Sequence, residues 1–221
     1  MEILLSPVEV RILGALIEKE LATPQYYPLS QNSLTNACNQ KSNRDPVMAL
    51  DEESVLNAIK ILRKSKLVWR VETMGSRVEK YEHNISEIHE FTQQEIGILC
   101  ELFLRGPQTV GEIRTRTARF CKFESLDEVE AVLQNLIDDT NIGPFVQKLP
   151  REMGRRENRY AHLFSGEVVI DTETNEKVDE YTVTAQDELK RIEALELQVP
   201  ELRAELAALR EQFEEFKKQF E

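Results

Sequence analysis

The segment "MGSRVEKYEH", Met74 to His83, returns later in the chain as "MGRRENRYAH", Met153 to His162. The two copies share the pattern Met-Gly-x-Arg-x-x-Lys/Arg-Tyr-x-His, which is too specific to be a coincidence. The glycine supplies the permissive backbone of a tight turn, and strand-like residues follow it. A further strand-like run, "VWRVET" or "PFVQKL", precedes each turn. The sequence therefore predicts two β-hairpins built on one plan.

Each hairpin follows three predicted helices. Both copies open with a Ser/Thr-x-x-Glu capping box, "SPVEVRIL" from Ser6 and "TQQEIGIL" from Thr92, in which hydroxyl and carboxylate satisfy free N–H groups of a new helix. The first copy continues with helices starting near Ser30 and in "DEESVLNAIKILRKSKLV", and the second with helices in "TVGEIRTRTARF" and "SLDEVEAVLQNLIDD". Three helices and a hairpin, repeated, predict two tandem winged helix-turn-helix domains, a mainly α fold with small β-hairpins (α+β).

A resemblance to a known family agrees with this prediction. The segment "TNACNQKSNRDPVMAL", the two Met-Gly-x-Arg hairpins and "HLFSGEVV" resemble the bacterial family of uncharacterised YceH-like proteins over nearly the whole chain. The resemblance implies tandem winged-helix domains with a helical C-terminal tail. It brings no established activity.

Charge is distributed unevenly between the predicted regions. These are winged-helix domains at residues 1–91 and 92–165, an acidic flexible linker at 166–185 and a helical tail at 186–221, within 221 residues of net charge −12. Residues 1–91 carry 11 Lys and Arg against 13 Asp and Glu, and residues 92–165 carry 10 against 11. The last 56 residues carry 7 against 16. The body is thus nearly neutral, so its charge does not exclude nucleic acid.

A polar run, "NACNQKSNRDPV", lies between two predicted helices of the first domain. Asparagine and glutamine can bond to adenine edges while lysine and arginine contact phosphates. The same side chains can instead cap helix ends and fix the elbow between the helices through bonds to the backbone. Both interpretations apply to the candidates Asn36, Asn39, Gln40, Lys41, Asn43 and Arg44.

The third helix of a winged helix usually enters the major groove, so its outer face should be polar and cationic. The first domain offers Asn57, Lys60 and Lys64 there, although Asp51 to Glu53 crowd the start of the helix. The third helix of the second domain contains acids and no Lys or Arg. Cations near the hairpins could track the DNA backbone or could pair with neighbouring glutamates. These wing candidates are Arg77, Lys80, Arg155, Arg156 and Arg159.

No motif predicts catalysis, a cofactor or a metal. The repeated His83 and His162 each lack a second ligand at a recognised spacing, so a structural role near the hairpin base is expected. The three cysteines share no disulfide or metal pattern and are expected to be inert. We expect no enzyme, no cofactor, and no membrane association, since no apolar run has transmembrane length. A cytoplasmic location is expected, since no signal peptide precedes the first helix.

The tail has its own pattern. From Ile192, apolar residues alternate by three and four as the a and d positions of a coiled coil, the preference being for a parallel dimer. Pro200 lies within the repeat and would cost about 3 kcal/mol in a continuous helix. The alternative is an amphipathic helix that folds back on the body or binds a partner groove. The dimerisation candidates are Ile192, Leu195, Val199, Leu202, Leu206, Leu209, Phe213 and Phe216.

Two functions remain open from the sequence. The first is a DNA-binding or transcription-regulator-like protein, dimeric through the tail, that contacts double-stranded DNA through the elbow, the third helix and the wings. The second is a protein-interaction adaptor in which winged helices bind an unidentified protein partner without binding DNA. The fold favours DNA because winged helices so often bind it, whereas the acid-only third helix of the second domain favours the adaptor.

Overall fold

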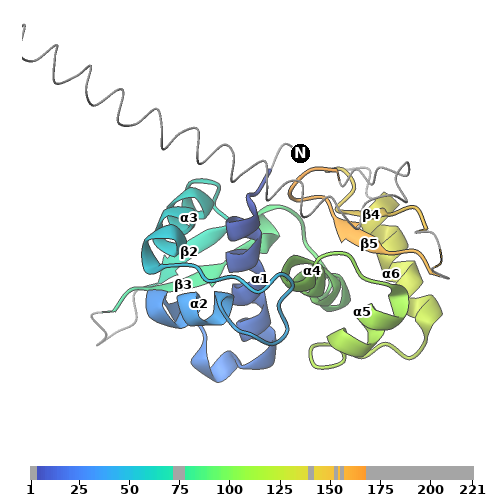
Figure 1. The fold of residues 1–221 in the computed structure, drawn as a ribbon, viewed down its shortest axis with the longest axis horizontal. Coiled ribbons are helices and arrows are strands. Elements are labelled where there is room, and N and C mark those ends of the chain that lie inside the picture. Colours follow the sequence, from blue (N-terminus) through green and yellow to red (C-terminus); the bar gives the residue numbers. More distant parts are fainter. Residues whose placement is uncertain (1–3, 72–77, 139–141, 152–153, 155–156, 168–221) are drawn as a thin grey trace, which may run out of the picture. The chain divides into compact units, whose positions relative to one another are not determined.

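The computed structural model describes residues 4–71, 78–138, 142–151, 154 and 157–167. The first half contains a three-stranded antiparallel sheet of order β1-β3-β2, in which Arg70 lies opposite Tyr81. Three helices pack with this sheet (Figure 1). The elements in chain order are α1 (Pro7–Ala22), β1 (Leu29–Ser30), α2 (Gln31–Cys38), α3 (Glu52–Lys64), β2 (Val68–Val71) and β3 (Lys80–His83), with single 3-10 turns at Pro24–Tyr26 and Ile85–Glu87.

The second half repeats the order of three helices and a hairpin. Its two strands are antiparallel, with Gln147 opposite Ala161. The elements are α4 (Gln93–Arg105), α5 (Val110–Thr117), α6 (Leu126–Asp138), β4 (Val146–Lys148) and β5 (Tyr160–His162). The prediction of an α+β fold made mainly of helices with small antiparallel sheets is therefore confirmed for the described residues. The predicted turn at Met74 to Arg77 lies outside them. Arg155 and Arg156 do too, but Gly154, where the second turn was predicted, is described and has a φ of 82°.

Local capping explains where the helices begin. Ser6 and Glu9 form the predicted capping box at the start of α1, and Thr92 and Glu95 form the one at the start of α4. A third box, Thr109 with Glu112, starts α5 and was not predicted. Because each box satisfies N–H groups that a helix leaves free, these short motifs fix the helix starts through contacts three residues apart.

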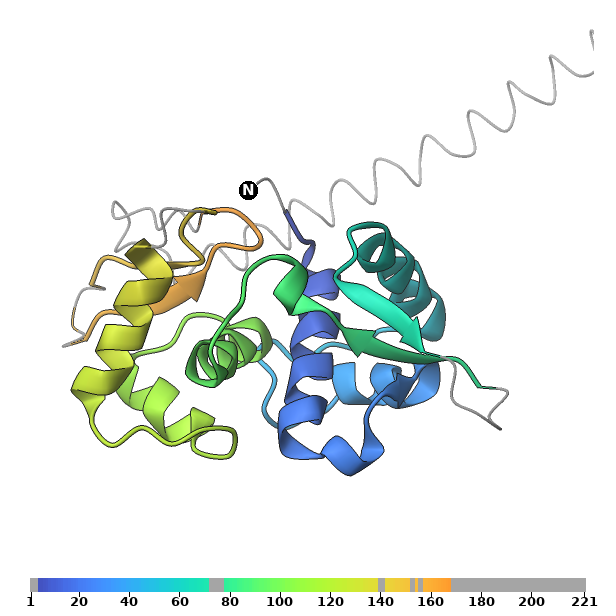
Figure 2. The same cartoon turned by 180° about the vertical axis from the view of Figure 1, so that it is seen from behind.

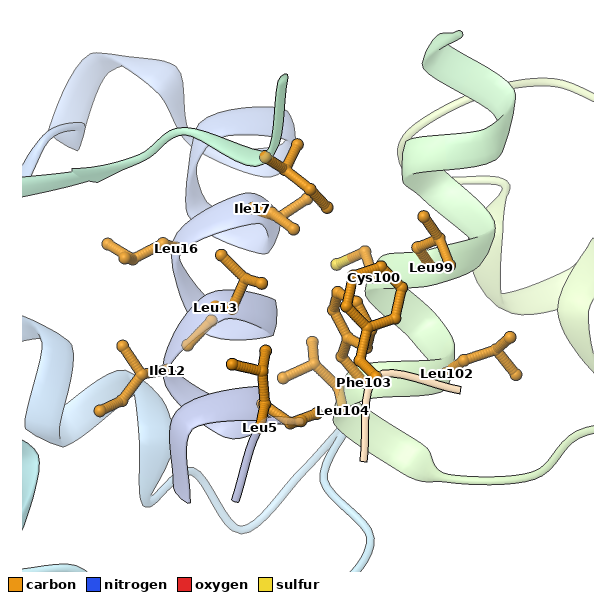
Figure 3. Packing of buried hydrophobic residues seen from close by; sticks show 14 of the residues in the cluster. Leu5, Ile12, Leu13, Leu16, Ile17, Leu99, Cys100, Leu102, Phe103 and Leu104 are labelled. Atoms are coloured by element: carbon orange, nitrogen blue, oxygen red, sulfur yellow. The ribbon is translucent and has the colours of Figure 1, made fainter. Parts of the chain in front are cut away.

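The two halves share one hydrophobic core. Helices α1 and α4 lie side by side at the centre of the body, and both views show them between the other elements of the two halves (Figures 1 and 2). Leu13 and Ile17 of α1 point toward Cys100 and Phe103 of α4, and all four are buried (Figure 3). The helices approach closely at Gly14, where an added Cβ would lie 2.9 Å from Phe103 Cβ.

Candidate functional site

The polar run after α2 is largely occupied with holding its own backbone. The Asn39 amide donates to Leu50 O at 2.7 Å, and its oxygen accepts from Leu50 N at 2.8 Å. This pair of bonds closes the loop between α2 and α3. Asn43 adopts a φ of 58°, a left-handed conformation that asparagine tolerates better than most residues, and its side-chain oxygen accepts from Arg105. Asn39 thus has the backbone-fixing role that the sequence left as one of two alternatives, whereas the Asn43 side chain binds another side chain, that of Arg105.

Arg44 lies in the interior, where it cannot reach a phosphate. Its side chain is 0% exposed, and it forms a two-pronged ion pair with Glu18 of α1, with N–O distances of 2.6 and 3.1 Å. The guanidinium also donates to the backbone oxygen of Ala37 and to the Gln40 side chain. The expectation that Arg44 contacts phosphate does not fit this placement. A cation followed by Asp-Pro in a loop gives no sign of burial, because its partner lies 26 positions earlier.

The ion pair continues across the junction between the halves. Glu18 Oε1 also lies 3.0 Å from Arg119, which is 2.7 Å from Glu101 of α4. Arg105 lies 3.2 Å from the other Glu101 oxygen, in an ion pair that is not aligned as a hydrogen bond. Burial alone would raise the pKa of Glu18, but hydrogen bonds from Arg44 and the charge of Arg119 hold it below its usual value. We call Glu18, Arg44, Glu101, Arg105 and Arg119 the ionic junction.

Several predicted contact residues do face solvent on the first half. Asn36 is exposed on α2, where its amide donates to Asn32, and Lys41 is exposed just beyond the helix. An open pocket of about 510 Å³ runs beside α2 and brings Asn36, Gln40 and Lys80 together with Lys19. Its described lining includes two lysines and hydroxyl and amide groups but no carboxylate, which is a chemistry suited to an anion.

The outer face of α3 carries the other predicted contacts. Asn57, Lys60 and Lys64 are exposed, and Lys60 donates to the Asn57 oxygen at 3.2 Å. Neither lysine forms an ion pair with a described residue. The three predicted acids, Asp51 to Glu53, stand exposed at the start of the same helix. The helix therefore has an acidic first turn and a cationic second half.

The cations of the second half are mostly paired internally. Arg116 bonds to Gln108 and Glu112, and Arg114 donates to two backbone oxygens after α5. Arg159, a predicted wing contact, lies 3.6 Å from Glu112. The acids Asp127, Glu130 and Asp138 are exposed along α6. The other predicted wing arginines, Arg77, Arg155 and Arg156, and the dimerisation candidates of the tail lie outside the described residues.

The histidines and cysteines have structural surroundings. His83 Nε2 lies 2.6 Å from Glu20, and its backbone N–H donates to the Tyr27 hydroxyl, at the base of the first hairpin. His162 packs edge-on against Phe103, and burial lowers its pKa to about 4. Burial raises the pKa of the Cys38 thiol to about 12. Among the described residues, no cluster of His, Cys, Asp or Glu could hold a metal ion.

Sequence reasoning missed three buried charges, Arg11, Glu18 and Glu101, which are 1%, 2% and 0% exposed. A signal was present for Arg11 and Glu101, whose neighbours along the helix are mostly apolar, as in "VEVRILGAL", whereas Glu18 is followed by Lys19 and Glu20 and gives no such signal. Buried charges need partners, so such positions point to internal ion pairs or to hydrogen bonds with the backbone. No helix among the described residues is long and apolar enough to cross a membrane.

These features define a class of protein: an α+β body of two similar helical halves, joined by an ionic junction around two buried glutamates, with exposed lysines on the first half. Within that class, the chain belongs to the family described as "Protein of unknown function, DUF480", whose model matches residues 5–155. The expected membership of an uncharacterised bacterial family is thereby confirmed.

Relatives in this family extend over the whole chain. A UPF0502 protein of Geobacter sulfurreducens is 52% identical over 224 residues, covering 100% of both chains. One of Aeromonas hydrophila is 47% identical and covers 96% of this chain and 97% of its own. One of Photobacterium profundum is 46% identical, with 97% and 98% covered. Their names state no activity, so function has to be argued from the site.

Proposed function

We propose that this protein binds double-stranded DNA through its first half, and that both halves are winged-helix modules. The order of three helices and an antiparallel hairpin in each half supports the winged-helix interpretation. In such modules the third helix contacts the major groove, and the hairpin contacts the backbone nearby. The proposal assigns a binding role and no catalysis, in a cytoplasmic protein.

The observation that carries the proposal is the contrast between α3 and α6. Lys60 and Lys64 extend from α3 without an ion-pair partner among the described residues, whereas the matching face of α6 presents Asp127, Glu130 and Asp138. A helix whose only charged side chains are acids would repel phosphate. We therefore assign DNA contact to α3. The second half has a structural role, because it packs against α1 in the shared core and so stabilises the first half.

The pocket beside α2 supplies the second contact of the proposed interface. Lys19 and Lys80 line it with Asn36, and no described carboxylate does. A backbone phosphate would find both positive charge and hydrogen-bond donors there. The acids at the start of α3 oppose phosphate at that end, so we place the DNA backbone nearer the second half of the helix and the α2 pocket.

Fluorescence anisotropy with labelled genomic duplexes at two salt concentrations tests this proposal. The double variant Lys60→Glu/Lys64→Glu should lose most of the affinity and should flatten the dependence of log affinity on log salt by about 0.9 for each phosphate that it no longer neutralises. The control matched in charge is Lys122→Glu/Lys148→Glu, which replaces two exposed lysines of the second half. Binding of the double variant at the wild-type level would refute the role of α3, and loss of binding by the control alone would place the interface in the second half.

A protein-interaction adaptor is the second candidate, because the first half exposes large apolar side chains. Trp69 of β2 is 51% exposed and Ile61 of α3 is 50% exposed. Tryptophan is enriched at the energetic centres of protein interfaces. If this function holds, Trp69→Ala should abolish recovery of a partner from nuclease-treated lysate while Lys122→Glu leaves it intact. An affinity for duplexes that Trp69→Ala leaves unchanged, with no partner recovered, would exclude it.

We further propose that residues 186–221 join two copies of the chain through the heptad beginning at Ile192. The support is the sustained a/d spacing of the sequence. Light scattering on the full chain and on a chain ending at residue 185 tests it. A dimer that becomes a monomer on truncation agrees with the proposal, and a monomeric full-length chain contradicts it.

A further inference from the structure

A second pocket, of about 250 Å³, lies beside α1 and belongs to neither proposed DNA contact. Residues of α1, of the elbow after α2, of the end of α4 and of β5 line it. Phe103, Pro46 and Met48 contribute apolar surface, and Arg11 and His162 contribute polar groups. A cavity of about 150 Å³ holds benzene, so this one has room for a benzene ring with a small substituent.

The pocket coincides with two unpartnered buried polar atoms. Arg11 is 1% exposed; its two terminal nitrogens donate to the backbone oxygens of Cys38 at 3.0 Å and Pro46 at 2.7 Å, while its Nε has no partner among the described residues. The buried Nδ1 of His162 has none there either. Buried polar groups are nearly always satisfied, so two exceptions around one cavity indicate a missing ligand group or water.

Arg11 is also a buried cation without an anion. Among the described residues no carboxylate lies within ion-pair distance of it, whereas Arg44, close by, has Glu18. Burial, followed by the charge of Arg44, lowers the pKa of Arg11. A charge in the interior that Asp45 and Glu18 compensate only in part is costly, and an anion brought near it recovers part of that cost. Chemistry at this position therefore favours a negatively charged ligand.

Two carboxylates, Asp45 and Glu167, also line the pocket and act against an anion. Both are exposed, so water screens their charge and their side chains can turn away. The Arg11 guanidinium is buried at the bottom of the pocket, where water screens its charge only weakly. We propose that this pocket binds a small organic carboxylate with an apolar body, its charged end toward Arg11 and its apolar part against Phe103 and Met48. The proposal does not depend on DNA binding.

Such a ligand would touch both halves of the body. Arg11 belongs to α1, and His162 and Phe103 belong to the second half. Arg11 also holds the backbone of the elbow at Pro46. A bound carboxylate would therefore stabilise the packing of α1, the elbow and α4 together, as any ligand specific for the folded state does.

Titration of the full chain with benzoate and with benzamide tests the proposal, because the two probes have the same size and differ in charge. The readout is the methyl resonance of Met48 in chain labelled at methionine methyl groups, which gives a simple spectrum from four methionines. We expect benzoate to shift this resonance and to bind about tenfold more tightly than benzamide, the factor that a charge-assisted contact supplies.

Two variants test separately the charge of Arg11 and the volume of the pocket. Arg11→Met removes the cation at similar volume and should reduce benzoate affinity about tenfold, to the level of benzamide. Ser165→Trp fills the cavity from its exposed edge, keeps the Met48 resonance as the readout, and should abolish the binding of both probes. If Arg11→Met fails to fold, the comparison of benzoate with benzamide in wild type and in Ser165→Trp decides. Equal affinity for the two probes, or no Met48 shift with benzoate at millimolar concentration, would overturn the proposal.

Discussion

Removing the Arg44 side chain should destabilise the body strongly although it touches no ligand. In Arg44→Met, Glu18 loses two charged hydrogen bonds, at 2.6 and 3.1 Å, inside the core. Breaking one side of a buried pair costs about 3–5 kcal/mol. Glu18 keeps Arg119 at 3.0 Å and Lys19 at 3.5 Å, which places the expected loss near the lower end, about 3 kcal/mol. The midpoint of thermal unfolding should fall by roughly 6–12 °C for a body of this size.

A matched control comes from an exposed ion pair of the same length. Arg70 lies 2.6 Å from Glu79, and the two side chains are 39% and 53% exposed. Because water screens exposed pairs, Arg70→Met should change the free energy of unfolding by less than about 1 kcal/mol. Urea unfolding followed by circular dichroism measures both variants. A loss below about 1 kcal/mol for Arg44→Met, equal to that of the control, would refute the assignment of Arg44 to the core.

Lowering the pH should abolish the difference in unfolding free energy between wild type and Arg44→Met. The pKa of Glu18 is lowered in the folded chain, so its contribution is complete above its unfolded value of 4.5 and is lost as pH falls through the lowered folded value. The difference in unfolding free energy between the two proteins should therefore be largest at neutral pH and should decrease as the pH falls. The double variant Glu18→Met/Arg44→Met should lose about 2 kcal/mol less than the sum of its single variants, since neither charge is left unpaired.

Three further predictions concern packing, the elbow and pH. Gly14→Ala should destabilise the folded chain by about 1–3 kcal/mol, because the added Cβ would lie 2.9 Å from Phe103 of α4. Gly111→Ala has open space around it and should stabilise α5 by up to about 1 kcal/mol. Urea unfolding should therefore give changes in unfolding free energy of opposite sign for the two variants. Asn39→Ala should cost about 2 kcal/mol by the same measurement, from its two bonds to Leu50. His162 should titrate near pH 4 by NMR. Because burial lowers this pKa from 6.5, the wild type should lose unfolding free energy as the pH falls from 6.5 to about 4, and His162→Phe should lose less.

The sequence predicted the helices and hairpins because their signals are local. The capping boxes at Ser6 and Thr92 act over three residues, and the apolar spacing of α3 and α6 repeats within each helix. The placement of Arg44 could not be predicted in this way. Arg44 lies in a loop, and its burial depends on Glu18 of α1 and on Arg119 from the second half. Such interactions arise only when the two halves pack, and a single sequence does not display that packing.

The exposed candidates were easier to predict for the same reason. Lys60 and Lys64 lie opposite the apolar stripe of α3, so helical periodicity alone places them outward. Asn36 and Asn39 lie only three residues apart, yet one faces solvent and the other binds Leu50. Asn36 is within the regular helix, where periodicity applies. Asn39 is at its end, where the direction of the next segment decides.

The elbow's position between α1 and the second half determines which experiments can test DNA binding. Arg44 is tied to Glu18, and Glu18 is tied to Arg119, so a substitution in the elbow perturbs the junction between the halves. A variant of Arg44 that fails to bind DNA would therefore be explained by misplaced helices as well as by removal of a phosphate-binding group. Lys60 and Lys64 have no such connection within the described residues, and their replacement leaves the core intact. Loss of binding in their variants, at unchanged unfolding free energy, is the result that assigns the interface to α3.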